Sequence, residues 1–391
     1  MSSASSKLFE PLQVGDVTLG NRVVMAPLTR FRATETHAPG PHAALYYSQR
    51  SAAPGTLLIS EATLIGEKAG GYFGVPGIYS DEQIAGWKKV WLPSFSIIYF
   101  SNPFQVVDAV HANGSFIYLQ LWALGRTADP AEIARENPAN EYTAASGIAL
   151  TGHAAPRAMT EDEIREFIQL YGVAASNAVH KAGFDGVEIH GANGYLVDQF
   201  LQDVSNNRTD SYGGSVENRS RFALEVIKAV VDAVGEKKTA IRLSPWSKFQ
   251  DMGMANPAPQ FTHLINNIRT SYPDFAYLHV VEPRVDGGVD RQTIPAGQTE
   301  ERDALYAIWS PKPLVSAGGH DRATGLDTAQ RTGVLVAYGR LFISNPDLVR
   351  RLKENLPLAK GNRATYYTPR DWTTTGYTDY PFAEQAVAAV L

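Results

Sequence analysis

Apolar residues gather in eight short runs along the chain, and longer stretches with helical spacing lie between most of them. The runs are nearly continuous, which is typical of strands covered on both faces of a parallel sheet. They span residues 21–28, 56–60, 115–121, 186–189, 239–243, 275–280, 313–317 and 334–338.

Helix start signals stand in the stretches between the runs. Thr160 and Glu163 have the spacing of a capping box, and they open a helix predicted over residues 161–182. A second capped helix is predicted over residues 216–234. We expect Asp81 to cap a third helix with its side chain.

A last helix is expected to begin at Asn345-Pro346, close to the C-terminal end of the pattern. No internal repeat, linker or second apolar core is visible in the 391 residues. Eight strands alternating with helices therefore predict an α/β fold, a (β/α)8 TIM barrel, as a single domain over residues 1–391.

One block breaks this pattern. Residues 90–105 hold two prolines, five aromatic residues and no charge, and helical spacing resumes after them. Removing the block places Ile84, Trp87, Val107 and Val110 on one amphipathic face, so we interpret it as an insertion into a helix. It is too short to span a bilayer. One hypothesis is an intron that is retained and read in frame, and the alternative is a functional element.

Composition and charge narrow the classes of function. A net charge of -5 and a pI near 6.0 argue against binding to nucleic acid or to an anionic membrane. Since the chain has no cysteine, it has no disulfides, thiolate metal ligands or thiol nucleophile. Residues 1–7 lack an apolar signal core, and we expect a disordered tail on a cytoplasmic protein that is a monomer or a homodimer.

The candidate chemistry is concentrated just after the fourth run. His190, Asn193 and Tyr195 lie within six residues, and Gly191 and Gly194 give this loop its freedom. In a parallel barrel the carboxyl ends of the strands carry the active site. Two hydrogen-bond donors beside a phenol suit a carbonyl oxygen that gains negative charge during a reaction. A lone histidine at a strand end is more often structural, so the assignment depends on its neighbours.

A second motif lies downstream. Residues 206–219 read N-x-R-x-D-x-Y-G-G-S-x-x-N-R, and residues 190–195 read H-G-A-N-G-Y. Together they closely resemble the old yellow enzyme family of FMN-dependent ene-reductases, and the resemblance runs from Leu8 to Phe382 with the one interruption. It implies tightly but non-covalently bound FMN, NADPH or NADH as reductant, and small enones or enals as substrates. No metal is implied.

The resemblance also implies roles for residues after the first three strands. The segment with Pro27 and Thr29 would lie against the flavin, Ala62 would allow close approach of the backbone, and Gln120 would contact the pyrimidine edge. Trp122 would shape the substrate pocket. The alternatives are a turn hydroxyl that satisfies backbone for Thr29 and a core indole for Trp122.

Arg242, at the end of the fifth strand, would lie beside the flavin N1–C2 edge in that family, where its charge stabilises the reduced ring. A structural salt bridge to Glu188 inside the barrel is the alternative. His279, within the sixth strand, is interpreted as a core residue.

Glycines follow the last two strands, where barrels usually bind phosphate. Gly318, Gly319, Gly339 and Arg340 are the candidate phosphate-binding residues. The aromatic pair Tyr366 and Tyr367 resembles the family's tail over the substrate pocket, although the spacer before Gly376 is longer than in the family.

The implied activity is that of an NADPH dehydrogenase or ene-reductase. Hydride would pass from NAD(P)H through FMN to the β-carbon of an α,β-unsaturated carbonyl compound, and Tyr195 would protonate the α-carbon. Two alternatives stay open. One is a flavin-dependent isomerase of an unsaturated aldehyde in secondary metabolism, against which the presence of Tyr195 argues, and the other is a catalytically idle barrel.

Overall fold

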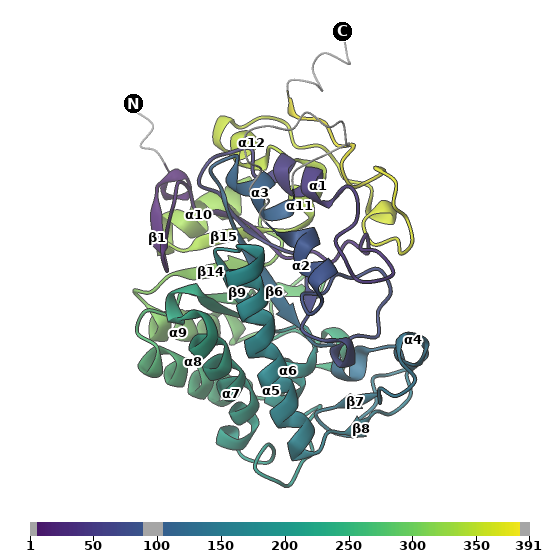
Figure 1. The fold of residues 1–391 in the computed structure, drawn as a ribbon. Helices are drawn as coiled ribbons and strands as arrows, with labels where there is room; N and C mark the ends of the chain where they lie inside the picture. The colour runs from purple at the N-terminus through teal and green to yellow at the C-terminus, as the bar shows by residue number, and fades with distance from the viewer. Residues whose placement is uncertain (1–5, 89–104, 384–391) are drawn as a thin grey trace.

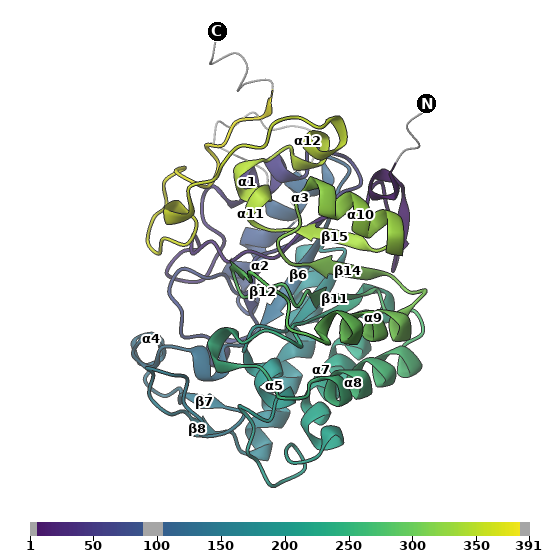
Figure 2. The same cartoon turned by 180° about the vertical axis from the view of Figure 1, so that it is seen from behind.

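A computed structural model describes residues 6–88 and 105–383. Its centre is a closed barrel of eight parallel strands with helices outside it (Figures 1 and 2), which confirms the predicted (β/α)8 fold. In order around the barrel the strands are β3 (Val23–Met25), β4 (Leu57–Ile59), β6 (Phe116–Trp122), β9 (Gly186–Gly191), β10 (Thr239–Leu243), β11 (Tyr277–Val281), β14 (Leu314–Ala317) and β15 (Leu335–Tyr338), which pairs with β3 again.

The strands match the predicted runs within a few residues. The strand β10 has the predicted bounds, whereas β3 is shorter than the run over 21–28. Ala26 N donates to the carbonyl of Tyr338 at 3.0 Å, and the next residue, Pro27, has no N–H with which to continue the ladder.

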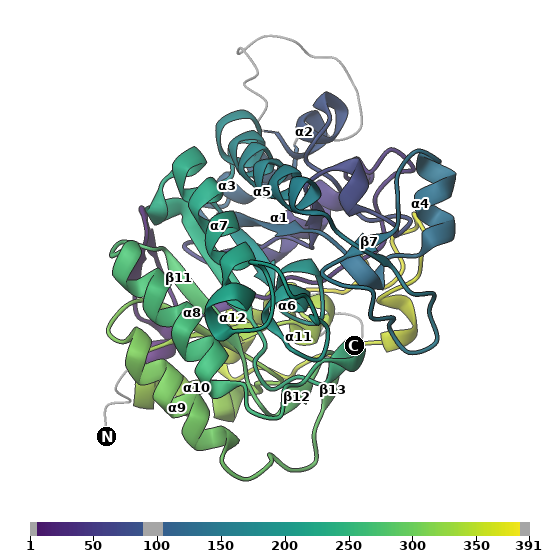
Figure 3. The same ribbon diagram turned by 90° about the horizontal axis from the view of Figure 1, so that it is seen from below.

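Helices form a ring around the barrel, and Figure 3 shows this ring from below. They include α1 (Ala43–Arg50), α2 (Asp81–Trp87), α3 (Val106–His111), α5 (Glu161–Ser176), α7 (Val216–Val234), α8 (Ala258–Ser271), α9 (Gln298–Trp309), α10 (Arg322–Thr332), α11 (Arg340–Ser344) and α12 (Leu348–Glu354). Two shorter helices, α4 (Pro130–Glu136) and α6 (Leu196–Leu201), lie in loops at the carboxyl ends of the strands.

Most helix predictions are confirmed at their starts. The capping box of Thr160 and Glu163 is formed at the start of α5, and the predicted helix over 161–182 finishes as a π-helical turn, Asn177–Ala182. Its end is set by Gly183, whose φ of 87° lies in the left-handed region.

Two helix starts were predicted wrongly, and one helix was missed. Ser80, not Asp81, caps α2. The Ser80 hydroxyl accepts a hydrogen bond from Gln83 N, and the Gln83 side chain accepts one from Ser80 N, so the two residues form a capping box. The C-terminal helix α12 begins at Leu348, after Asp347 rather than at Asn345-Pro346. The stretch 128–158, in which no helix was predicted, contains α4, which begins at Pro130.

A hairpin of β1 (Leu12–Val14) and β2 (Val17–Leu19) covers the amino-terminal end of the barrel. Val14 and Leu19 are fully buried among the apolar residues that fill the barrel interior. This end is thereby occupied by side chains, which leaves the carboxyl end for a site. The hairpin follows a short 3-10 helix, Lys7–Phe9, capped by Ser6, so the last two residues of the expected tail 1–7 are ordered.

The interrupted helix has two described parts, α2 and α3. Ile84, Trp87, Val107 and Val110 are all buried in the same hydrophobic core, as expected for one continuous face. Residues 89–104, which hold nearly all of the predicted insertion, lie outside the described residues. Across the described ranges, no helix is long and apolar enough to cross a membrane.

Candidate active site

His190 and Arg242 mark the carboxyl ends of two neighbouring strands. They are register partners across β9 and β10, so their side chains lie on the same face of the barrel wall. His190 is buried, and its Nδ1 has no hydrogen-bond partner among the described residues. Burial lowers the pKa of His190 well below its usual value, and the charges of Arg242 and His279 lower it further. The imidazole is therefore neutral near pH 7, and a neutral imidazole can donate one hydrogen bond.

The loop after His190 is held by its main chain. Asn193 adopts φ 59° and Gly194 φ 80°, both in the left-handed region. Asn193 N donates to Ser244 Oγ at 2.7 Å, and Gln250 Nε2 donates to the Asn193 carbonyl at 2.7 Å. The Oδ1 of Asn193 is buried without a partner in the described part of the chain. The carboxamide is thus left available while its backbone is fixed.

Asp198 and Gln199 of α6 hold the backbone of the same loop at Gly194. Neither residue was predicted from the sequence. Asp198 Oδ2 accepts from Gly194 N at 2.9 Å, and Gln199 Nε2 donates to the Gly194 carbonyl at 2.7 Å. Burial raises the pKa of Asp198 to about 7. The available signal was the adjacent polar pair, Asp198 and Gln199, inside an otherwise apolar helix that begins just after Tyr195.

Three aromatic rings form a cluster at the mouth of the barrel. The ring of Tyr195 lies 4.8 Å from that of His190 and 4.9 Å from that of Trp122, measured between centroids. Burial raises the pKa of the Tyr195 hydroxyl. Trp122 is buried, and its Nε1 has no acceptor among the described residues. The structure therefore brings Trp122 into contact with two of the predicted catalytic residues.

Glu188 is occupied by partners other than Arg242. Gln120 Nε2 donates to Glu188 Oε1 at 2.8 Å, and His279 Nδ1 lies 2.8 Å from Glu188 Oε2. Within the described ranges, Arg242 forms no hydrogen bond or ion pair, and its Nε is buried. The alternative of a salt bridge to Glu188 was therefore wrong, although burial lowers the pKa of Arg242 and the charge of Glu188 still acts against that effect. His279 is fully buried and serves this network, as expected of a core residue.

The segment after β3 passes the same mouth. Thr29 is half-buried, and its hydroxyl forms no hydrogen bond in the described part of the chain, so it does not satisfy a turn. Glu61 Oε2 accepts from Arg30 N at 3.1 Å, which ties this segment to the end of β4. The neighbouring Ala62 is buried. Thr29 and Ala62 thus belong to two segments that are fastened together.

The loops after β14 and β15 meet at the proposed phosphate end. Gly318 and Gly319 adopt φ 142° and 62°, and a Cβ on Gly319 would lie 2.5 Å from Asp290 Oδ1. Arg340 Nη2 lies 3.3 Å from both carboxylate oxygens of Asp290. Gly339 has φ -97°, which other residues also adopt. The sequence reasoning missed Asp290, which is distant from the glycines in the sequence.

Tyr366 and Tyr367 lie apart from the ring cluster. Tyr366 is buried, its carbonyl accepts from Arg30 Nε at 3.1 Å, and its hydroxyl is directed at Gly361. The two tyrosine rings lie 6.1 Å apart. Among the described residues, neither ring contacts Trp122, His190 or Tyr195, so the structure does not bring the tail pair together with these residues.

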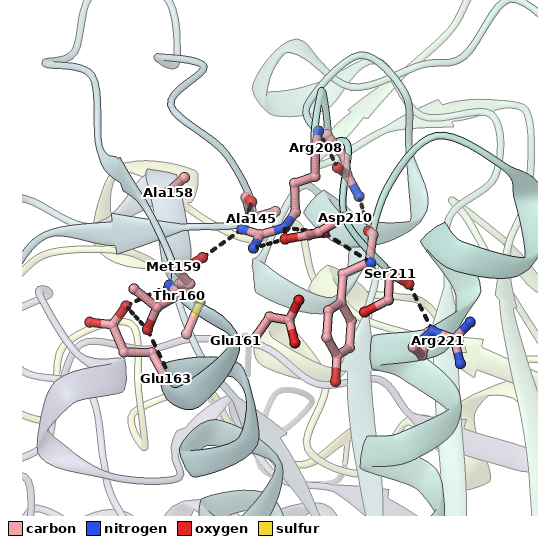
Figure 4. Close-up of polar contacts among 12 residues, drawn as sticks. Ala145, Ala158, Met159, Thr160, Glu161, Glu163, Arg208, Asp210, Ser211 and Arg221 are labelled. Atoms are coloured by element: carbon pink, nitrogen blue, oxygen red, sulfur yellow. Dashed lines mark hydrogen bonds and ion pairs between the residues drawn. The ribbon is translucent and has the colours of Figure 1, made fainter.

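The motif over residues 206–219 braces the loops beneath the site (Figure 4). Arg208 Nη1 donates to the carbonyls of Ala145 and Met159, at 2.8 and 2.7 Å, and the guanidinium also pairs with Asp210. The motif thus fastens the long loop before α5 to the loop before α7, and its contribution is structural.

The buried polar atoms at the mouth test the fit of a cofactor. His190 Nδ1, Asn193 Oδ1, Trp122 Nε1 and Arg242 Nε are all buried without partners in the described ranges. Native proteins rarely leave such groups unpaired, so a polar ligand suits this end of the barrel. The close approach at Gly318 and the cation of Arg340 provide a place for its phosphate. These features fit FMN. No group of three or more His, Cys, Asp or Glu side chains in the described chain could hold a metal ion.

Comparisons with known proteins agree with this arrangement. A model of the NADH:flavin oxidoreductase / NADH oxidase family matches residues 7–359. Chanoclavine-I aldehyde reductase from Penicillium roqueforti is 47% identical over 392 residues, which cover 98% of this chain and 99% of the relative. A probable inactive reductase from Epichloe festucae var. lolii is 44% identical over 98% of this chain and 97% of its own length.

Solved structures show the same fold. The old yellow enzyme from Pichia sp. AKU4542 superposes with a TM-score of 0.82 at 35% identity, covering 96% of this chain and 94% of that one. The family match spans nearly the whole barrel, and the motifs at residues 190–195 and 206–219 fall within it. The chain therefore belongs to the NADH:flavin oxidoreductase / NADH oxidase family and is a fungal-type old yellow enzyme.

Proposed function

We propose that this protein is an FMN-dependent ene-reductase that reduces the alkene of small α,β-unsaturated aldehydes or ketones. The observation that carries the proposal is the neutral, buried His190 beside the unpaired Asn193 carboxamide and the Tyr195 hydroxyl. A neutral imidazole and a carboxamide are hydrogen-bond donors without charge. They suit an enone oxygen that becomes negative only in the transition state.

The residues of this chain then divide the work. His190 and Asn193 bind and orient the carbonyl oxygen of the substrate. Tyr195 holds a proton on a hydroxyl whose pKa is raised by burial, so it stays protonated near neutral pH and serves as the proton source for the α-carbon. Trp122 packs against Tyr195 edge to face and limits the space around the substrate.

In this proposal FMN is bound tightly without a covalent bond. Pro27, Thr29, Ala62, Gln120 and Arg242 would line its ring, and Gly318, Gly319, Gly339 and Arg340 would hold its phosphate. The chemistry supplied by bound FMN is hydride transfer, from NADPH or NADH and then to the β-carbon of the alkene. Arg242, with no ion-pair partner in the described chain, provides a positive charge for the ring edge.

Two other functions compete with this one. The first is a barrel without catalytic activity. Two observations favour it: one relative is described as a probable inactive reductase, and the sequence holds an apolar block over residues 90–105. A flavin-dependent isomerase would return the hydride to its substrate, and Tyr195 would then have no proton to supply.

A single series of measurements separates these functions. The purified protein is reduced anaerobically with NADPH or NADH, and then reoxidised with a panel of enones and enals while the absorbance of the flavin is followed. The proposal expects flavin reduction followed by reoxidation that yields the saturated carbonyl compound. A colourless protein that binds no added FMN would favour the idle barrel, and recovery of an isomerised alkene would favour the isomerase.

A further inference from the structure

A cavity of about 470 Å³ opens next to the aromatic ring cluster. Its walls come from segments that are far apart in the sequence, among them the loop over residues 70–74, the start of α4 and the C-terminal segment at Pro369. The lining is completed by Phe31, Thr127 and His153. Tyr72 lines the cavity, and its ring lies 5.8 Å from that of Trp122. One ring thus separates the cavity from the residues that would hold the reacting carbonyl compound.

The loop over residues 70–74 is fixed on both sides. Asp129 N donates to the Gly71 carbonyl at 3.0 Å, and Ala33 N donates to the Gly74 carbonyl at 3.0 Å. Gly71 has φ 115°, and a Cβ there would lie 2.7 Å from the Cβ of Ala128. This close approach places Tyr72 and Phe73 at defined positions on the cavity wall.

Arg32 holds the C-terminal segment that follows Pro369 in place. The guanidinium of Arg32 donates to the carbonyls of Asp371, of Thr373 at 2.9 Å and of Thr375 at 3.0 Å. It also pairs with the Asp371 carboxylate at 3.2 Å. Trp372 adds a hydrogen bond from Nε1 to the Ala33 carbonyl at 3.1 Å.

Aromatic contacts join this segment to the loop over residues 70–74. The ring of Trp372 lies 6.3 Å from that of Phe73, and the Arg370 guanidinium lies 4.2 Å from the centroid of Phe73. Figure 3 shows the yellow C-terminal segment beside α4. The long spacer between Tyr367 and Gly376 therefore packs against the loop that lines the cavity, and it contributes Pro369 to the lining.

We infer that this cavity binds the distal aromatic ring system of a bulky α,β-unsaturated aldehyde or ketone, and that the segment over residues 369–373 limits its size. The inference rests on the proposed function. The volume lies in the range of pockets that enclose small ligands. Phe31, Tyr72 and Phe73 offer ring faces and edges to a planar aromatic group. Asp129, which has no basic partner in the described chain, disfavours an anionic one.

The kinetic test compares two substrates with the FMN-loaded protein. 3-(2-Naphthyl)propenal extends beyond the ring cluster, whereas 2-cyclohexenone does not. Phe73→Ala should lower kcat/KM for the naphthyl enal by about 3- to 10-fold, which is the contribution of one aromatic contact. It should change kcat/KM for cyclohexenone by less than about twofold, within the scatter of neutral surface changes. Equal effects on both substrates, or none on the naphthyl enal, would overturn the inference.

Arg32→Ala tests, in the same assay, the contacts by which Arg32 holds the C-terminal segment. Arg32 is a positioning residue, so KM for the naphthyl enal should rise while kcat for cyclohexenone is kept. Leu45→Ala, on the exposed face of α1, is the control and should change neither. A loss of kcat for cyclohexenone that equals the change in KM for the naphthyl enal would overturn the role assigned to Arg32.

A binding measurement with a ligand that cannot be reduced tests the cavity assignment independently of the proposed function. Calorimetric titration with 3-(2-naphthyl)propanal, which has no alkene to reduce, should show about 3- to 10-fold weaker binding to Phe73→Ala than to the wild type. If no enone is reduced but this difference is found, the proposed function fails and the cavity assignment stands. If cyclohexenone is reduced and both proteins bind the aldehyde equally, the cavity assignment fails and the proposed function stands.

Discussion

Arg242 and His190 stand side by side at the carboxyl ends of β10 and β9, as register partners of the parallel ladder. The positive charge of Arg242 adds to burial in holding the pKa of His190 well below its usual value. Protonation of the imidazole next to this guanidinium would place two positive charges together in a buried site. His190 is therefore neutral over the physiological pH range, as its proposed role of an uncharged donor requires.

Ligand affinity should consequently show no histidine titration. The contribution of His190 to the affinity of the FMN-loaded protein for a neutral enone, measured against His190→Gln, should stay constant between about pH 6 and pH 8, where an ordinary histidine changes its charge. Because the pKa of His190 is lowered, a change is expected only at more acidic pH. Calorimetric titrations at several pH values measure this. A sigmoidal change in affinity centred near pH 6.5 that disappears in His190→Gln would contradict the assignment.

Asp198 should make stability depend on pH in a defined direction. Its pKa is raised by burial in the folded protein to about 7 from its usual value of 3.8, so folding favours the protonated carboxyl. Relative to Asp198→Asn, the stability that this carboxyl contributes is fully present below the unfolded pKa and is lost as the pH rises through about 7.

Urea unfolding of both proteins between pH 4 and pH 8 measures this effect. The difference in free energy of unfolding should shift against the wild type by about 1.4 kcal/mol per pH unit between the two pKa values. Glu61, whose pKa burial raises to about 7, is present in both proteins and cancels in the comparison. A difference that does not change with pH would show that Asp198 is ionised in the fold throughout.

The pairing of Arg340 with Asp290 predicts opposite effects of two substitutions. Arg340→Ala removes a charge-assisted contact to phosphate, worth roughly 1.5 to 3 kcal/mol, so FMN occupancy should fall while the fold is kept. Asp290→Asn should strengthen FMN binding, because it frees the guanidinium and removes a negative charge near Gly319. Titration of the apoprotein with FMN measures both. Full flavin in purified Arg340→Ala would show that Arg340 is misassigned.

Deletion of residues 90–105 should raise thermal stability and soluble yield. The two described helices beside this block, α2 and α3, bury Trp87 and Val107 in the same core, so joining them continues one apolar face away from the mouth of the barrel. Thermal unfolding and turnover of the deletion variant check this. A variant that is less stable, or that loses turnover while it keeps its flavin, would show that the block is a functional element.

Much of the barrel could be predicted because its signals are local. The strand β10 and the helix α7 have their predicted bounds. A continuous apolar run marks β10, and α7 is bounded by Ser215, which caps its start, and by Gly235 at its end. The end of β3 was placed too late, because its apolar run continues past the last ladder hydrogen bond. Helix α4 was missed because its cap, Asp129 before Pro130, stands in a polar stretch with little apolar spacing.

The candidate site was predictable where its residues share one motif. His190, Asn193 and Tyr195 lie in one short loop, and their proximity follows from the sequence. The contacts of Asp290 with Arg340 and of Arg32 with Thr373 join residues that are 50 and 341 positions apart. Such contacts depend on the closure of the barrel and on the path of the C-terminal segment, neither of which a local pattern contains.

The central claim is that Tyr195 donates the proton to the substrate, and the most direct test measures the two half-reactions separately in Tyr195→Phe. The ring packing against His190 and Trp122 is kept, while the hydroxyl is lost. Rapid mixing with NADPH should show nearly unchanged flavin reduction. Rapid mixing of the reduced protein with 2-cyclohexenone should show reoxidation slowed by about 10² to 10⁴-fold, the usual contribution of general acid catalysis. Equal slowing of both half-reactions, or unaltered reoxidation by the enone, would contradict the account.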